Sequence, residues 1–101
     1  MKEEFSSRLR RKSKKVQVQG FEVEIRELSG GDYLEITEKS MQGQGVNYKD
    51  FLNLALLKSV FVNGEPLFEG EADLQEIPAS VYSELVTEIT QINGLENPKK
   101  S

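Results

Sequence analysis

The 101-residue sequence contains no cysteine and no histidine. Without cysteine, the chain has no disulfide, no thiol nucleophile and no cysteine-ligated zinc site. Without histidine, it lacks the side chain that most often titrates near neutral pH, which excludes Ser-His-Asp catalysis. Carboxylates and lysines could act as acid or base if they were buried, but the sequence shows no pair arranged for that chemistry. We therefore expect a protein that is not an enzyme and that holds neither a metal nor a cofactor.

Long apolar runs are also missing. No stretch reaches the roughly 18 consecutive apolar residues that a membrane helix needs, and the charged N-terminus is not followed by the apolar segment of a secretory signal. We expect neither a membrane span nor a signal peptide, and therefore a cytoplasmic protein. A chain of 101 residues normally forms one domain, with one modest core but no deep catalytic cleft.

Basic residues are scarce outside the N-terminus. Residues 1–15 contain two acids and seven basic side chains: Lys2, Arg8, Arg10, Arg11, Lys12, Lys14 and Lys15. The rest of the chain is acidic enough to bring the formal net charge to −4. The only apolar residues of this stretch are Met1, Phe5 and Leu9, which would bury too little area to hold a short helix. We predict that residues 1–15 form a flexible basic arm.

The next segment alternates between apolar and polar residues. Its apolar positions are Val16, Val18, Phe21, Val23 and Ile25. A period of two is typical of β-structure with one solvated face. Gly20 interrupts the alternation, as a tight turn or a bulge would. The pattern predicts a β-hairpin or a bent strand over residues 16–27.

Two helices are predicted in the middle of the chain, each preceded by a side chain that can cap it. Ser29 precedes a weakly amphipathic helix over residues 30–41. A flexible connection through residues 42–45 should follow, because two glycines so close together destabilise a helix by about 2 kcal/mol. Asn47 then precedes a helix over residues 48–61.

The C-terminal part contains a turn signal and one further helix. An Asn-Gly pair is typical of a tight turn, so residues 62–68 are expected to form a short turn or, beginning at Val60, a hairpin. Pro78 favours the start of a helix over residues 79–93, in which apolar residues recur at helical spacing. Gly94 is a typical residue for ending that helix.

Together these elements predict an α+β fold, with an N-terminal β-hairpin (about 16–27) followed by three helices (about 30–41, 48–61 and 79–93) and a short turn or hairpin near 62–68. We assign residues 16–95 to a single α+β domain and residues 96–101 to a free tail.

The segment from Tyr48 to Val62 is too apolar to be a helix with one buried face. At helical spacing, its apolar residues point in almost every direction. Either the helix is central and covered by the other elements, or it meets another chain. Because the other elements offer little area, we expect at least one face to bind a client segment or a second copy. The expected contact residues are Phe51, Leu52, Leu54, Leu56, Leu57 and Phe61, with Tyr82 and Leu85 of the last helix.

The basic arm has three interpretations. Arg8, Arg10, Arg11, Lys12, Lys14 and Lys15 could contact nucleic-acid phosphates, dock on the acidic face of a neighbour, or simply remain solvated. The arm lacks the interleaved aromatic residues of a single-strand binder, and the acidic body would repel nucleic acid, so the solvated arm is favoured. Two weaker motifs have simple explanations: Ser-Gly-Gly-Asp at 29–32 is a helix cap and not a phosphate cradle, and the acidic loop at 69–73 lacks the spacing of a calcium loop.

The sequence resembles the tail assembly chaperones of long-tailed bacteriophages over residues 16–95. The resemblance lies in the opening pattern VQVQGFEVEIRELSGGDYLEI, in the apolar FLNLALLKSVF with its NGEPLF turn, and in the closing IPASVYSELVTEITQINGL. It implies a non-catalytic chaperone in the host cytoplasm that binds the tape measure protein and keeps it soluble until tail tube subunits polymerise around it. In many members a frameshifted longer form recruits the tube subunit. The basic arm is not part of the family pattern.

Two hypotheses about function therefore stand, with a purely structural virion component as a third option. The first is a phage tail assembly chaperone that binds and solubilises the tape measure protein during virion morphogenesis. The alternative is a small nucleic-acid-associated regulator that acts through the N-terminal arm.

Overall fold

The alternating N-terminal segment forms an antiparallel hairpin in the computed structural model, which describes residues 3 and 9–95. Strand β1 (Ser13–Val18) pairs with β2 (Phe21–Arg26), and the loop between them has positive φ at both residues, 54° and 81°. Two such residues form the type I′ turn whose twist matches that of the strands. The predicted hairpin is confirmed, but β1 begins at Ser13 and not at Val16. Backbone pairing extends it, because an edge strand needs no apolar side chain to continue the ladder.

The hairpin belongs to a four-stranded sheet of order β1-β2-β5-β6. Strand β5 (Val60–Val62) pairs antiparallel with β2, and β6 (Glu65–Pro66) closes a second tight turn on β5. The predicted helix over 48–61 is therefore too long, because its last residues form β5. Apolar β-branched and aromatic residues followed by an Asn-Gly turn favour a strand there once β2 offers a partner. The hairpin alternative for this segment is confirmed.

Three main helices accompany the sheet. Helix α2 (Gly30–Lys39) begins at Ser29, whose Oγ accepts a hydrogen bond from the backbone N–H of Asp32 at 3.0 Å. Helix α3 (Tyr48–Ser59) begins at Asn47, whose side-chain oxygen caps Asp50 in the same way. Helix α5 (Ala79–Ile92) follows Pro78. Both predicted side-chain caps are confirmed.

Smaller elements fill the connections. The predicted flexible segment at 42–45 belongs to a short hairpin of β3 (Met41–Gln42) and β4 (Gly45–Val46), so α2 ends before Met41. Gly43, with φ at 61°, makes its turn possible. A short helix, α4 (Glu71–Leu74), lies in the segment that the sequence suggested was a loop.

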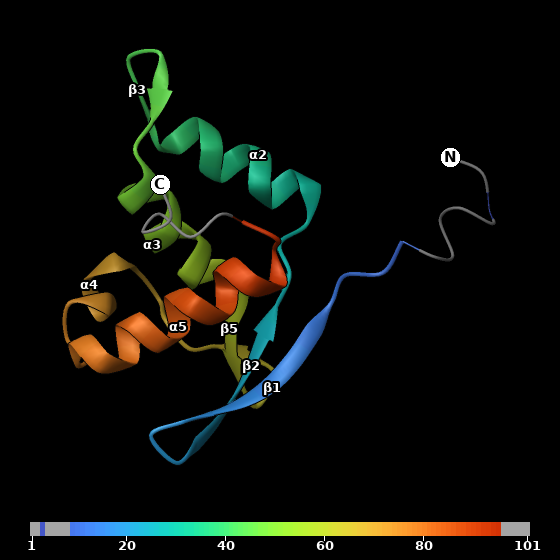
Figure 1. Ribbon diagram of the computed structural model, residues 1–101, viewed down its shortest axis with the longest axis vertical. Helices are drawn as coiled ribbons and strands as arrows, with labels where there is room; N and C mark the ends of the chain where they lie inside the picture. Colours follow the sequence, from blue (N-terminus) through green and yellow to red (C-terminus); the bar gives the residue numbers. More distant parts are fainter. Residues whose placement is uncertain (1–2, 4–8, 96–101) are drawn as a thin grey trace.

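Helix α3 lies at the centre of the domain. Figure 1 shows α5 crossing in front of α3 and β5, and α2, which contacts α3, at the end of the molecule opposite the hairpin tip. Helices α3 and α5 contact the sheet, and its core face carries Ile25 and Val60. We call the opposite face, which carries Glu24 and Phe61, the open face. None of the helices within residues 9–95 is long and apolar enough to cross a membrane. The core is formed by Val18, Val23, Ile25, Leu28, Ile36, Phe51, Leu52, Ala55, Leu56, Val60, Phe68, Leu74, Leu85, Ile89 and Ile92.

The C-terminus of α5 is attached to the start of α2 through Asn93. Its Oδ1 accepts a hydrogen bond from the backbone N–H of Leu28 at 2.9 Å, and its Nδ2 donates to the carbonyl of Ile89 at 2.8 Å. Gly94, with φ at 65°, ends the helix, and the N–H of Leu95 donates to the carbonyl of Thr90 at 2.9 Å. Together with the bond from the N–H of Gly94 to the carbonyl of Gln91, this is a Schellman motif, which confirms the predicted helix end. The Asn93 bridge joins this helix end to the segment between β2 and α2.

We predict that Asn93→Ala lowers the free energy of unfolding by about 1–3 kcal/mol, because the N–H of the buried Leu28 loses its acceptor. Urea denaturation followed by circular dichroism measures the change. Gln91→Ala, an exposed position in the same turn of α5, is the matched control and should change stability much less. Equal effects of the two substitutions would show that the Asn93 bridge does not hold the domain together.

Candidate functional site

The eight predicted contact residues divide into two groups. Phe51, Leu52, Leu56 and Leu85 are at most 7% exposed and belong to the core of this chain. The other four, Leu54, Leu57, Phe61 and Tyr82, are partly exposed. The expectation that too few elements remain to cover α3 is wrong, because α2, α4, α5, β2 and β6 all pack against it. Contact of these residues with a partner stays a prediction, and only the second group is accessible for it.

Two of the accessible residues are already engaged within the chain. The Tyr82 hydroxyl donates a hydrogen bond to Asn53 Oδ1 at 2.6 Å, which joins α5 to α3, and burial raises the pKa of Tyr82. The ring of Phe61, on the open face of the sheet, lies under the Arg26 guanidinium at 3.8 Å from its centroid. Such a cation–π contact stabilises an aromatic ring that the core does not cover.

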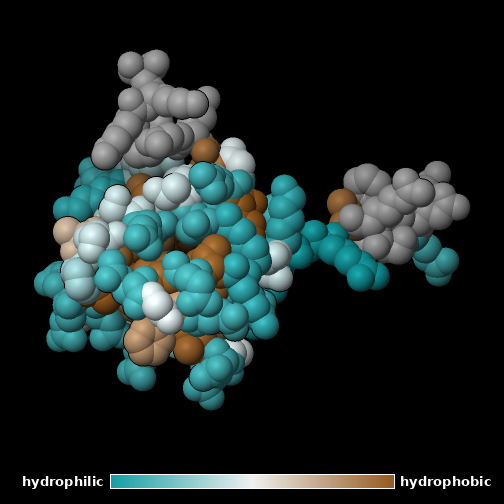
Figure 2. Space-filling view, turned by 60° about the horizontal axis from the view of Figure 1, so that its bottom comes forward, coloured by the Kyte–Doolittle hydropathy of each residue, from teal (hydrophilic) through white to brown (hydrophobic). Residues whose placement is uncertain are grey.

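A groove with apolar walls opens where the hairpin tip, the β5–β6 turn and the start of α5 meet. We call it the apolar groove. Its volume is about 290 Å³, and Gln19 is the polar residue among those that line it: Val18, Gln19, Phe21, Val23, Val62, Leu67, Ile77, Pro78, Val81 and Leu85. Figure 2 turns the lower end of Figure 1 toward the viewer and shows apolar side chains exposed between hydrophilic ones.

The groove exposes large apolar side chains at its edge. Phe21 is 73% exposed and Leu67 is 41% exposed, whereas Val18, Val23 and Leu85 form a buried floor. The groove exists because α5 begins at Ala79 and leaves the end of the hairpin uncovered. Of the predicted contact residues, only Leu85 lines it. The sequence did not mark the other residues that line the groove. Phe21, for example, follows the same alternation as the core residues, and no local pattern shows that α5 leaves it uncovered.

A second group of exposed apolar side chains lies at the opposite end of the molecule, on α2 and the β3–β4 hairpin. It consists of Tyr33, Leu34, Met41 and Val46, of which Leu34 is the most exposed at 69%. Tyr33 also contacts the ring of Phe51 edge-on, with centroids 5.4 Å apart. None of these four side chains lines the apolar groove.

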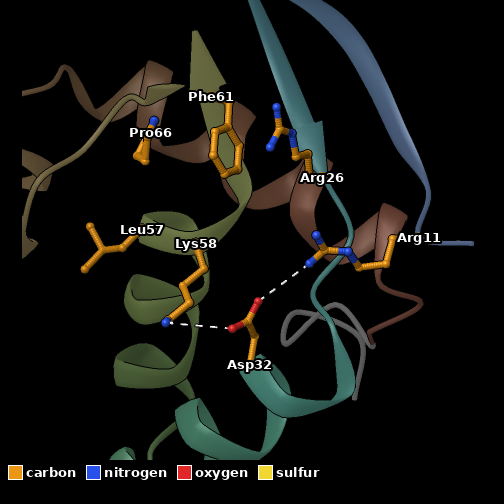
Figure 3. A pocket seen from close by; sticks show the side chains of 7 residues that line it. All are labelled: Arg11, Arg26, Asp32, Leu57, Lys58, Phe61 and Pro66. Carbon is orange, nitrogen blue, oxygen red and sulfur yellow. Dashed lines mark ion pairs between the residues drawn. The ribbon is translucent and has the colours of Figure 1, made fainter. Parts of the chain in front are cut away.

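A charged pocket of about 340 Å³ lies on the open face of the sheet (Figure 3). Asp32 of α2 is placed between Arg11, which precedes β1, and Lys58 of α3, at 3.8 Å from each. Lys58 also pairs with Glu35 at 3.1 Å, and Arg26 pairs with Glu24 at 2.9 Å. The cations that line the pocket each face a carboxylate. The pocket therefore joins α2, α3 and the N-terminal segment, and it has no surplus charge for binding an anion.

The described part of the basic arm is paired with the acidic body. Lys14 pairs with Glu88 of α5, Lys15 lies 4.0 Å from Glu22, and the backbone N–H of Lys12 donates to Glu27 at 2.9 Å. Strand β1 includes Lys14 and Lys15, so these two belong to the sheet and not to an arm. Arg10 is exposed. Arg8, like the predicted free tail at 96–101, lies outside the described residues.

Comparison with solved structures gives one informative match. The fold is similar to that in the "Structure of bacteriophage HK97 tail assembly chaperone", with a TM-score of 0.59 and 22% sequence identity, over 81% of this chain and 85% of that chain. The chain has a tail-assembly-chaperone-like fold. Comparison with family models and with curated proteins finds no match.

Glu35, which pairs with Lys58 beside the charged pocket, makes a pH-dependent contribution to stability. The hydrogen bond from Lys58, aided by the charge of Lys39, lowers the pKa of Glu35 below the usual 4.5. The same hydrogen bond raises the pKa of Lys58. A carboxylate whose folded pKa is lowered stabilises the fold above its unfolded pKa, and this contribution is lost as the pH falls through the folded pKa.

We therefore predict that Glu35→Gln lowers the urea midpoint slightly near neutral pH, and that the difference from wild type disappears well below pH 4.5. Salt should also reduce the difference, because the pair is exposed. Glu38→Gln, an exposed acid on the same helix, is the control. A difference that persists unchanged in acid would disprove an ionic role for Glu35.

Proposed function

We propose that this protein is a phage tail assembly chaperone that binds the tape measure protein and keeps it soluble during tail morphogenesis. The observation that carries the proposal is the match of its fold to that of the HK97 tail assembly chaperone over most of both chains. The apolar groove supplies a surface with the chemistry that the role requires. It exposes apolar side chains that can contact an aggregation-prone client without any chemical step.

The chemistry of the apolar groove supports a role in binding. The groove is lined almost entirely by aliphatic and aromatic side chains, which neither donate nor accept protons. Within residues 9–95, no group of three or more acidic side chains gathers as a metal site would require. We propose that the chain acts in the host cytoplasm and recruits the tail tube subunit through a frameshifted longer form. We also propose that the chain self-associates.

The alternative of a nucleic-acid-associated regulator receives less support. Phosphate binding depends on cations that are free to replace counterions. Arg11, Lys14 and Lys15 instead face acidic side chains of the same chain. The acidic body would further oppose the approach of a polyanion.

Co-expression tests the proposal. The wild-type chain should increase the soluble fraction of the tape measure protein of the same phage severalfold over a control without chaperone. Phe21→Ser should abolish most of this effect, because truncation of an aromatic anchor that acts as a binding hot spot removes about 2 kcal/mol or more of binding. The readout is the client in the soluble fraction, normalised to the amount of folded chaperone.

Leu34→Ser is the matched control, since Leu34 and Phe21 have similar exposures, 69% and 73%, at opposite ends of the molecule. It should leave client solubility unchanged. A client that stays insoluble with the wild-type chain would rule out the function. Equal loss with both variants would rule out the groove as the binding site.

A further inference from the structure

Acidic side chains adjoin the apolar groove. Val62, which lines it, is directly opposite Glu65 in the β5–β6 ladder. Residues opposite one another in an antiparallel pair point to the same face of the sheet, so Glu65 lies on the groove side. Glu76 and Glu84 are exposed, and each directly precedes a residue that lines the groove. Acids therefore flank the groove at β6, before α5 and along α5.

No basic side chain offsets these acids on the same elements. The sequence has no lysine or arginine between Lys58 and Lys99, a stretch that includes β5, β6, α4 and α5. Within the described part of this stretch there are seven acids: Glu65, Glu69, Glu71, Asp73, Glu76, Glu84 and Glu88. On the hairpin wall, Lys14 is paired with Glu88 and Lys15 with Glu22, and the lining residue at the tip is the neutral Gln19. The surroundings of the groove are acidic.

We propose that the groove recognises a client segment in which apolar anchor side chains are flanked by lysine or arginine. This inference rests on the proposed function and names the chemistry of the segment that the chaperone selects. A groove of about 290 Å³ accepts a few anchors and not a whole helix. Its apolar lining supplies the affinity. The exposed acids add a modest attraction that favours basic partners and speeds encounter, while acidic segments are repelled.

Binding of designed peptides to the purified full-length chain tests the proposal. Three fluorescein-labelled peptides of about 15 residues, long enough to form a helix, share the same leucine and phenylalanine spacing and are flanked by lysine, glutamine or glutamate. Fluorescence anisotropy at low salt should show the lysine peptide binding at least about fivefold more tightly than the glutamate peptide, as expected for a few exposed charge pairs. Added salt should reduce the difference.

Charge reversal in the protein provides the second arm. The double variant Glu65→Lys/Glu76→Lys should lose the preference for the lysine peptide or reverse it, whereas Glu38→Lys, an exposed acid on α2, should keep it. Phe21→Ser should weaken binding of all three peptides. Equal affinity of the wild-type chain for the lysine and glutamate peptides would overturn the proposal. Tighter binding of a peptide of residues 1–12 than of the lysine peptide would also overturn it, by assigning the groove to a second copy.

The outcomes separate this inference from the proposed function. If the chain solubilises its client through Phe21 but binds the three peptides alike, only the charge preference fails. If the lysine peptide binds selectively but the client stays insoluble with the wild-type chain, the groove chemistry stands and the chaperone function fails.

Discussion

The pairing of β2 with β5 is the interaction on which the rest of the domain depends. It places Ile25 opposite Val60, and both side chains are completely buried. The chain leaves α3 at Ser59 and enters β5 at once, so this pairing holds the end of α3 against the core face of the sheet. A lone hairpin of β1 and β2 would be only marginally stable. With β5 and β6 added, the sheet is wide enough for α3 and α5 to pack on it side by side.

The parts of the fold that could be predicted are those that local chemistry determines. The alternation in the hairpin, the caps at Ser29 and Asn47, and the end of α5 at Gly94 all act within a few residues of the chain. Local chemistry does not determine the boundary between α3 and β5, because an unbroken apolar run has no period that distinguishes helix from strand. Only the partner strand β2, far away in the sequence, decides it. The burial of Phe51, Leu52 and Leu56 depends on the same pairing, so the sequence alone did not show which apolar residues of α3 belong to the core.

The candidate site was harder to predict for a related reason. Its walls come from three separate parts of the chain, and each lining residue has the same local pattern as the core residues beside it. Phe21 continues the alternation of Val23 and Ile25, yet those two are buried and Phe21 is exposed. The difference arises from the position of α5, which covers the middle of the hairpin and not its tip. Leu85 was predicted because it is apolar at helical spacing. Residues on the floor of the apolar groove and residues of the core share this property, so it does not distinguish them.

The acidic surroundings of the groove also bear on how the protein remains soluble with its apolar side chains exposed. An uncovered aromatic side chain forgoes about 1.5–3 kcal/mol of burial, a substantial part of the stability of a small domain. The tight turn at Gln19 and Gly20 nevertheless holds Phe21 in one place, so a partner need not order a loop to reach it. Two copies that met groove to groove would bring acids against acids, which opposes that association. The same charges that repel a second copy attract a basic segment, so the groove is disfavoured as a surface for self-association.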